Sequence, residues 1–364
     1  MKIIHAALVT AASLTAGNLA AQTGPTNEWT RMRLIVPQGY VCYHTTAPIT
    51  IDGRLDESDW QRAPWTRDFA DIEGEGKPKP RFRTRAKMLW DDQNFYVGAE
   101  LEEPHVWATL TNHDSVIFQD NDFEVFMDPN GDSHEYYEIE INALNTEWDL
   151  LLPKPYKDQG SARDAWEIPG LQTAVHVHGT RNDLRDTDQG WSVEFAFPWK
   201  ALASYAHRRC PPREGDQWRI NFSRVEWQIR IVDGKYVKVP NTPEDNWVWS
   251  PQGIIDMHRP EKWGYVQFTR QPFGTVAFLP DPSMPARNAL QEIYYAQRTY
   301  TAANHHYAAS LGDLGLAGMS IQGLARLPAL KLTKDGYEAT AEIRLPGGRR
   351  EHWHIRQDAL VWRK

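Results

Sequence analysis

The sequence contains only two cysteines, Cys42 and Cys210, among its 364 residues. This number excludes a small scaffold held together by disulfides, and the spacing excludes a cysteine-based metal knuckle. One disulfide between the two, or two free buried thiols, remain alternatives, because spacing along the chain does not show whether the Cα atoms are close enough to bridge.

An excess of positive charge and long apolar runs are also missing. The formal net charge is −8, so the chain does not offer the basic surface that nucleic acid requires. Beyond the first residues no segment is apolar enough to cross a bilayer core of about 30 Å. We therefore predict no nucleic-acid partner and no membrane span, and the sequence shows no internal repeat.

The first residues have the pattern of a secretory signal peptide. Lys2 precedes an apolar run that continues to Ala16, and small residues lead up to Ala21. The run is shorter than the roughly 20 residues that a membrane-spanning helix needs. We predict that residues 1–21 are a signal peptide and that the protein is exported to the periplasm or the medium.

Aromatic residues are abundant, with 16 Trp and 14 Tyr. Tryptophan at this density indicates either large core residues of a β-sandwich or exposed flat faces on which sugar rings stack. Because an uncovered indole is unfavourable in water, we expect most of the tryptophans in the core.

Residues 45–270 show the alternation of short strands. Two hairpins are expected, 85–90 with 95–101 and 122–128 with 135–142, each around a turn rich in Asp and Asn. Many short strands separated by turn residues predict a mainly β fold, an antiparallel two-sheet β-sandwich of the jelly-roll or immunoglobulin-like kind. Further strands are expected at 147–152, 173–177, 191–197, 218–227 and 263–268.

The pattern changes in the last quarter of the chain. A proline-rich linker is expected at 271–286, followed by apolar residues at helical spacing from Asn288 to Ser310. Alternation returns at 330–342 and 351–362. We predict a small C-terminal appendage over 287–364, a helix with a β-hairpin that docks on the sandwich, whose protein partner the sequence does not identify.

Three segments resemble the signature of the family 9 carbohydrate-binding modules and the wider DOMON-like sandwiches. Residues 49–60 are similar to the IDGxLDExxW opening of the family, and residues 120–128 to its DDxxEVFxD strand. Trp249-Ser250 with residues 260–264 is similar to its closing element. The match is nearest to full-length bacterial family 9-like proteins, and it does not cover the tail after Pro285.

The resemblance implies an exported, non-catalytic protein that binds an oligo- or polysaccharide and supports polysaccharide breakdown by others. In family members two tryptophans enclose the sugar; here Phe118 and Met257 occupy those positions, and Met257 offers no aromatic face. The resemblance places sugar-bonding groups at Glu124 and Asn142, and Glu140 replaces an arginine of the family. Two further candidates come from the residues themselves: Asp120, a carboxylate near the same strands, and His258, which stands beside Met257 in a loop. The alternatives to sugar contact are a solvated turn at 120–122 and an outward-facing strand residue at Glu124. We expect Trp249 and Trp263 in the core.

Calcium is the one cofactor that the sequence suggests. Asp128, Asn130 and Asp132 place oxygen side chains at every second position, as calcium loops do, and calcium also occurs in the family. A later bidentate Glu is missing, and a hairpin turn explains the same residues.

Two other classes of function remain alternatives. A glycoside hydrolase would need two carboxyl groups roughly 5–10 Å apart, a condition that a chain with 48 acidic residues meets easily. A haem-binding redox sandwich could use Met257 or His258 as a ligand, although the sequence has no Cys-x-x-Cys-His motif.

Overall fold

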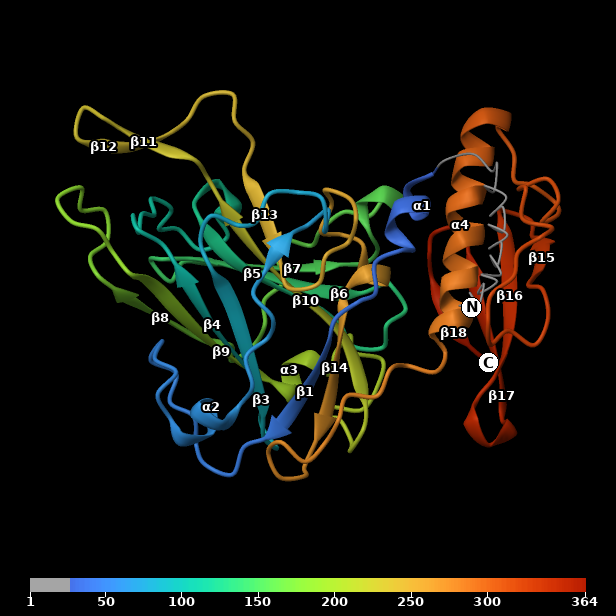
Figure 1. The fold of residues 1–364 in the computed structure, drawn as a ribbon, viewed down its shortest axis with the longest axis horizontal. Helices are drawn as coiled ribbons and strands as arrows, with labels where there is room; N and C mark the ends of the chain where they lie inside the picture. Colours follow the sequence, from blue (N-terminus) through green and yellow to red (C-terminus); the bar gives the residue numbers. More distant parts are fainter. Residues whose placement is uncertain (1–26) are drawn as a thin grey trace, which may run out of the picture.

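The computed structural model describes residues 27–364. The predicted signal peptide, residues 1–21, lies outside the described residues. The fold is mainly β, as expected, with one large sheet beside a smaller unit that contains the longest helix (Figure 1). The strands of the large sheet are β1 (Gly39–His44), β2 (Ala70–Asp71), β3 (Thr84–Trp90), β4 (Asn94–Glu102), β5 (Asp122–Asp128), β6 (Tyr136–Asn142), β7 (Glu147–Leu152), β8 (Gln172–His178), β9 (Gly190–Pro198), β10 (Gln217–Glu226), β13 (Asp245–Val248) and β14 (Gly264–Thr269).

The remaining elements of this region are short. A two-stranded hairpin projects from the large sheet, and single helical turns connect several strands. They are β11 (Ile229–Val232), β12 (Lys235–Lys238), α1 (Glu28–Met32), α2 (Ser58–Arg62), α3 (Trp199–Leu202), η1 (Ile117–Gln119), η2 (Tyr156–Asp158) and η3 (Pro260–Lys262).

The large sheet is mixed, which corrects the prediction of a purely antiparallel sandwich. Its order is β7-β6-β5-β10-β14-β1-β3-β4-β9-β8, with β13 beside β10 and β2 beside β13. Strand β1 runs parallel to both β14 and β3, while the other pairs are antiparallel. The long crossover from β1 to β3, which contains α2, is the kind of connection that a parallel pair requires. The sheet also starts before residue 45, because β1 begins at Gly39.

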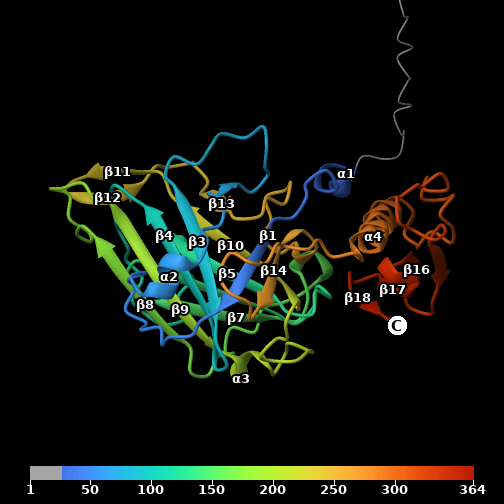
Figure 2. The ribbon, with the colours of Figure 1, turned by 60° about the horizontal axis from the view of Figure 1, so that its bottom comes forward.

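Both layers of the sandwich come from this one curled sheet (Figure 2). The half with β5, β6 and β10 faces the half with β3, β4 and β9, and their alternate apolar side chains share one core. Phe123 of β5, for example, lies 6.1 Å from Phe195 of β9 between ring centroids. Strands β14 and β1 join the halves, so the prediction of two separate sheets is wrong although the layered core is present.

Most of the tryptophans are core residues. Ten of the 16 are buried, including Trp249 and Trp263, which confirms the expectation that those two belong to the core. Both cysteines are free thiols; Cys42 lies in the core, and burial raises its pKa.

The opening signature segment is an anchor for the edge of the core. The backbone N–H groups of Asp52 and Gly53 and the indole of Trp60 all donate hydrogen bonds to the carboxylate of Glu194 on β9, at 3.1, 2.8 and 2.8 Å. Gly53 has a φ of +83°, and a Cβ at this position would lie 2.5 Å from the backbone nitrogen of His176. The motif therefore needs glycine for both conformation and space.

Replacing Gly53 by alanine should lower the free energy of unfolding by about 2–4 kcal/mol, because left-handed strain adds to a backbone clash. Gly215 is a matched control, since its φ is +79° but no atom lies within 4 Å of the position that a Cβ would take. Gly215→Ala should cost only the strain, about 1 kcal/mol. Chemical denaturation of both variants measures the difference, and equal losses would show that the contact with His176 does not matter.

The C-terminal unit pairs α4 (Met284–Asn304) with a four-stranded antiparallel sheet. Helix α4 begins inside the predicted linker 271–286, with Pro285 in its first turn, where the missing N–H costs nothing. The sheet has four strands rather than one hairpin. It contains β15 (Ala329–Leu332), β16 (Tyr337–Arg344), β17 (Arg350–Arg356) and β18 (Val361–Arg363), with η4 (Pro346–Gly348) between β16 and β17.

This unit has its own apolar core, to which the N-terminal helix contributes. Trp29 of α1 stacks on Tyr295 of α4 with ring centroids 5.7 Å apart. The segment before α4 also packs on the large sheet, where Phe273 stacks on Tyr43 at 4.9 Å. Within residues 27–364 no helix is both long and apolar enough to cross a membrane.

Candidate functional site

The predicted site residues gather on the outer face of β5 and β6. Along β5, Phe123, Val125 and Met127 enter the core, so Asp122 and Glu124 point to the opposite face. In register, Asp122 lies opposite Asn142 and Glu124 opposite Glu140. The alternation of the two strands thus brings three carboxyl groups together, and Glu138 joins them from the next outward position of β6.

These four carboxyl groups are buried together. Glu124, the most exposed of them, has 5% of its surface accessible. Burial raises the pKa of each group above its ordinary value, to about 7 for Glu124, and for Asp122, Glu138 and Glu140 the neighbouring carboxylates raise it further. No lysine or arginine of the described chain forms an ion pair with any of them.

Several of their oxygens lack a hydrogen-bond partner. Glu140 accepts the backbone N–H of Phe118 at 2.9 Å, and one oxygen of Asp122 accepts that of Val225 at 3.1 Å. The second oxygen of Asp122 and one oxygen each of Glu124 and Glu138 are buried without a partner. Such orphaned polar atoms are rare in folded proteins and require an explanation.

Asp120 and Asn142 have structural roles instead. Asp120 accepts hydrogen bonds from the backbone of Thr109 and Leu110, from the Thr109 hydroxyl and from the Asn142 amide, at 2.7–3.1 Å. The Asn142 carbonyl accepts the backbone N–H of Leu144 and Thr146. In this conformation neither side chain has the free capacity for a sugar hydroxyl that the family resemblance implies.

An aromatic surface lies beside the carboxyl groups. Phe118 stacks on Trp148 of β7 with ring centroids 6.5 Å apart, and both rings are half-buried. Tyr156 is 45% exposed, and its hydroxyl makes no hydrogen bond within the described chain. Its pKa is raised to about 12, first by burial and then by Glu138 and other carboxylates, which places Tyr156 close to the buried cluster.

Met257 does not face Phe118 across an open slot. Its side chain is 8% exposed and packs in an apolar cluster with Phe126, Tyr136 and Trp263, on the same outer face but farther along the strands. The Gln252 amide donates a hydrogen bond to its sulfur at 3.2 Å. The two-sided arrangement around a sugar ring that the resemblance implies is therefore not formed by this pair.

His258 lies next to Tyr156 at the edge of that cluster. Its Nδ1 is 2.9 Å from the Tyr136 hydroxyl, and its ring meets the Tyr156 ring edge to face at 4.4 Å. Burial lowers the pKa of His258 to about 4, so the ring is neutral at pH 7. A neutral imidazole beside an exposed phenol can exchange hydrogen bonds with a sugar without carrying charge.

The loop with Asp128, Asn130 and Asp132 is closed by its own hydrogen bonds. The two oxygens of Asp128 accept the backbone N–H groups of Gly131 and Ser133 at 2.8 and 2.9 Å. Asp132 accepts the Asn130 amide and the backbone N–H of His134. These contacts are those of a tight hairpin turn, which accounts for the Asp and Asn residues of the loop without an ion.

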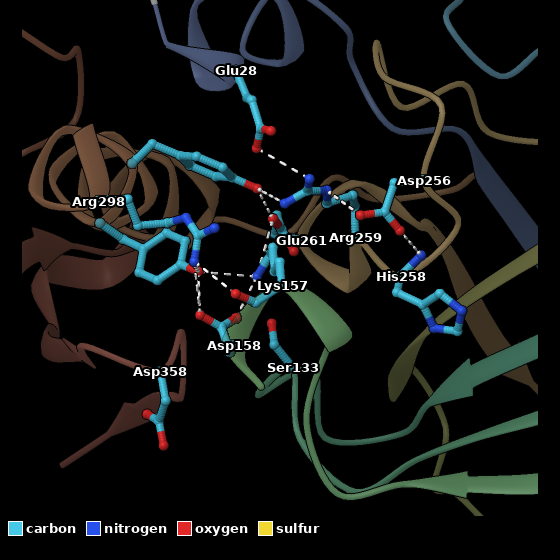
Figure 3. Close-up of polar contacts among 12 residues, drawn as sticks. Glu28, Ser133, Lys157, Asp158, Asp256, His258, Arg259, Glu261, Arg298 and Asp358 are labelled. Carbon is cyan, nitrogen blue, oxygen red and sulfur yellow. Dashed lines mark hydrogen bonds and ion pairs between the residues drawn. The ribbon is translucent and has the colours of Figure 1, made fainter. Parts of the chain in front are cut away.

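Two loops that border the site are fixed to the C-terminal unit (Figure 3). Directly after Tyr156, Lys157 pairs with Asp158 at 2.7 Å, and Asp158 accepts the Tyr294 hydroxyl of α4 and pairs with Arg298 at 3.3 Å. The side chains of Lys157 and Asp158 are almost fully buried. Helix α4 thereby sets the position of the Tyr156 loop.

The second loop carries His258. Arg259 pairs with Asp256 at 3.0 Å and with Glu28 of α1 at 3.1 Å, and it donates to the Tyr295 hydroxyl. Glu261 accepts the Tyr295 hydroxyl and lies 3.9 Å from Lys157. In Figure 3 the His258 ring points away from these ion pairs. The loop therefore contacts the C-terminal unit through Arg259 and presents His258 on its other side.

A cleft of about 880 Å³ lies elsewhere, between the large sheet and the C-terminal unit. Arg208, Tyr265, Arg287, Trp353 and Trp362 contribute to its walls. Most of its guanidinium groups are already paired; Arg208, for example, bonds two backbone carbonyls and Asp216. None of the sugar-site residues predicted from the sequence lines it.

Sequence reasoning did not identify Glu138, Trp148 or Tyr156 as part of this region. Glu138 had a detectable signal, because Glu138 and Glu140 alternate with apolar residues and so share the face of Glu124. Tyr156 had none, since its place depends on contacts between its loop and a helix more than a hundred residues later.

Comparisons with known proteins show which proteins the sandwich is similar to. Residues 51–216 match the family described as carbohydrate family 9 binding domain-like. The chain is 26% identical over 117 residues to the exoglucanase XynX of Acetivibrio thermocellus; the match covers 32% of this chain and 9% of that enzyme. Similar solved structures are family 9 carbohydrate-binding modules from Caldicellulosiruptor kristjanssonii, in complex with cellotriose (17% identity, TM-score 0.43, covering 67% of this chain and all of the module) and with glucose (17%, 0.42, 65% and all).

The sandwich is thus similar to a class of carbohydrate-binding β-domains. In particular, residues 51–216, a little under half of the chain, match the carbohydrate family 9 binding domain-like family, which confirms the resemblance found in the sequence. The likeness to the wider DOMON-like group stays a prediction.

Proposed function

We propose that this protein binds an oligo- or polysaccharide without cleaving it, outside the cytoplasm, and so supports polysaccharide breakdown by other proteins. The match of residues 51–216 to the family 9-like binding domains carries the proposal. Export follows from the signal-peptide pattern of residues 1–21, and the supporting role from the occurrence of a related segment in an exoglucanase.

We place the sugar on the aromatic surface formed by Phe118, Trp148 and Tyr156, with His258 at its edge. A sugar ring presents axial C–H groups that pack on aromatic faces, and a few fixed polar groups then choose its orientation. The 45% exposure of Tyr156 and its unused hydroxyl suit both needs. Since Met257 supplies no second ring, we expect binding on one face of the sugar rather than enclosure.

The buried carboxyl groups argue against hydrolysis at this site. Oxygens of Asp122, Glu124 and Glu140 lie within 4.8 Å of one another, and the side chains are at most 5% exposed. A glycosidic bond must fit between a catalytic pair that is roughly 5–10 Å apart. The separation is at the short end of this range, and the burial of the three side chains leaves a glycosidic bond no access to them.

Replacing Tyr156 by alanine should weaken glycan binding about tenfold or more, because one stacked aromatic face contributes on the order of 1–2 kcal/mol. Isothermal titration of the mature protein against a panel of plant glycans and oligosaccharides measures the affinity. Trp362→Ala, a half-buried aromatic residue of the cleft, is the matched control and should bind as the wild type does.

Two results would overturn the proposal. No binding to any member of the panel would remove the function, and loss of binding in Trp362→Ala but not in Tyr156→Ala would move the site to the cleft. Release of reducing sugar from a bound glycan would favour the hydrolase alternative. A Soret band in the purified protein would favour the haem alternative, although the Met257 sulfur already accepts a hydrogen bond from Gln252.

A further inference from the structure

We propose that Asp122, Glu124 and Glu140 form a site for a hard divalent cation, with Ca²⁺ as the ion of best fit. The site lies on the outer face of β5 and β6, beneath the aromatic surface, and differs from the loop 128–132 suggested by the sequence. It depends on the carboxyl groups alone, so it stands or fails independently of sugar binding.

The spacing of the three carboxyl groups suits one ion. Each offers an oxygen, and these oxygens all lie within 4.8 Å of one another. Calcium holds its oxygen ligands at about 2.3–2.6 Å, so ligands on opposite sides of the ion are about 5 Å apart. A cation among the three oxygens can therefore contact all of them without a large rearrangement of the strands.

A second observation, on another strand, points to a ligand at the same place. Ser223 of β10 lies opposite Glu124 in register, and its side chain is completely buried. Its hydroxyl lies beside Glu124 but makes no hydrogen bond of normal geometry with any described residue, and neither do one oxygen of Asp122 and one of Glu124. A metal ion would account for all three orphaned atoms together, because each is an oxygen of the kind that calcium binds.

No lysine or arginine of the described residues forms an ion pair with this cluster. Lys238 attracts Asp122 only at longer range, because its ammonium group lies over the Trp227 ring, 3.4 Å from the ring centre. Glu138 and Glu244 add further negative charge to the surroundings of Glu124 and Glu140. Buried carboxyl groups without a counter-ion destabilise a fold, and a bound cation removes that penalty.

The donor set indicates the class of metal. All the candidate ligands are carboxylate or hydroxyl oxygens, and the cluster contains no histidine or cysteine. Oxygen-only sites favour Ca²⁺, Mg²⁺ and Mn²⁺ over Zn²⁺ and Cu²⁺. Because three carboxylates that can each be bidentate suit a high coordination number, Ca²⁺ is preferred over Mg²⁺.

The experiment compares the mature full-length protein after treatment with a chelator and after addition of CaCl₂. Elemental analysis following dialysis should find one Ca²⁺ per chain. Differential scanning fluorimetry should show a melting temperature about 5 °C higher at a hundredfold excess over Kd. Neither readout involves a sugar, so failure here leaves the carbohydrate proposal untouched, and the reverse holds as well.

Variants locate the ion. Glu124→Gln should lower Ca²⁺ affinity at least about tenfold while melting, in chelator, at or above the temperature of the wild type, since one buried charge is removed. Glu140→Gln should do the same and can keep the bond from Phe118. Glu75→Gln is the control, because Glu75 is exposed and belongs to neither group of candidate metal ligands in the described residues.

The site is refuted if none of Ca²⁺, Mg²⁺ or Mn²⁺ binds stoichiometrically, or if Glu124→Gln and Glu140→Gln keep the wild-type calcium response. Loss of that response in Asp132→Asn alone would place the ion in the loop 128–132 and also overturn the proposal. Tighter binding of Mn²⁺ or Mg²⁺ than of Ca²⁺, abolished by the same two variants, would support the site.

Discussion

Replacement of Arg224 by alanine should lower the free energy of unfolding by about 3–5 kcal/mol. Arg224 is completely buried on β10, and its guanidinium pairs with Glu103 at 2.9 Å and Glu226 at 2.8 Å. It also donates to the Thr84 hydroxyl and to the carbonyl of Glu102. Without it, two buried carboxylates lose their closest cation.

Chemical denaturation at pH 7 measures this loss. A domain is typically stable by about 5–15 kcal/mol, so the variant should unfold at a much lower denaturant concentration. Arg213→Ala is the control, because Arg213 is exposed and forms no ion pair within residues 27–364; it should change stability by less than about 0.5 kcal/mol. A loss below about 1 kcal/mol for Arg224→Ala would show that Glu103 and Glu226 are easily neutralised by protons instead.

Replacement of Glu261 by alanine should cost about 3 kcal/mol and should also weaken glycan binding. Glu261 is buried where the large sheet meets α4. Its carboxylate accepts the Tyr295 hydroxyl and interacts with two cations, Lys157 and Arg259. Its removal takes one negatively charged partner away from Lys157 and Arg259, which are both buried. Because Tyr156 precedes Lys157 and His258 precedes Arg259, we expect both site loops to shift.

The effect of Glu261 should depend on pH. Burial alone would raise its pKa, but Lys157 and Arg259 hold the pKa below its ordinary value. A lowered pKa stabilises the fold above the unfolded value of about 4.5 and loses that contribution as pH falls through the folded pKa. The stability difference between wild type and Glu261→Ala should therefore be largest at pH 7 and shrink below about pH 4.

Denaturation curves at several pH values and titration with the best glycan measure both effects. Glu292→Gln, on helix α4, is the control, since its ion pair with Arg33 at 3.3 Å is more exposed than Glu261 and should contribute less than about 1 kcal/mol. A Glu261→Ala protein that is destabilised but binds glycan as tightly as the wild type would show that α4 does not position the site.

The alternation of the sequence predicted much of the large sheet. Strands β4, β5, β6 and β9 have regular apolar and polar positions and lie within two residues of their expected bounds. Strand β1 was missed because its residues do not alternate between apolar and polar, and its parallel pairing depends on β14, the last strand of the sheet. The hairpin of β11 and β12 was also missed, although Asp233-Gly234 is a strong turn signal.

The site was predicted less completely than the fold. Periodicity shows that Glu124 and Glu140 leave the core, but it does not show what covers them. Asp120 and Asn142 are bonded by a loop near Thr109 and Leu110, a contact that no pattern along the chain reveals. The site itself stays a prediction, and its chemistry depends on neighbours such as Thr109 and Leu110 that lie far from Asp120 and Asn142 in the pattern of the strands.

The pairing of β1 with β14 has a consequence for synthesis of the protein. These two strands are hydrogen-bonded neighbours although they stand at the beginning and the end of the large sheet. Until the ribosome releases β14, both β1 and β10 carry an unpaired edge, and such edges attract other chains. A nascent polypeptide that ends before Gly264 should accordingly be prone to aggregation through these two open edges.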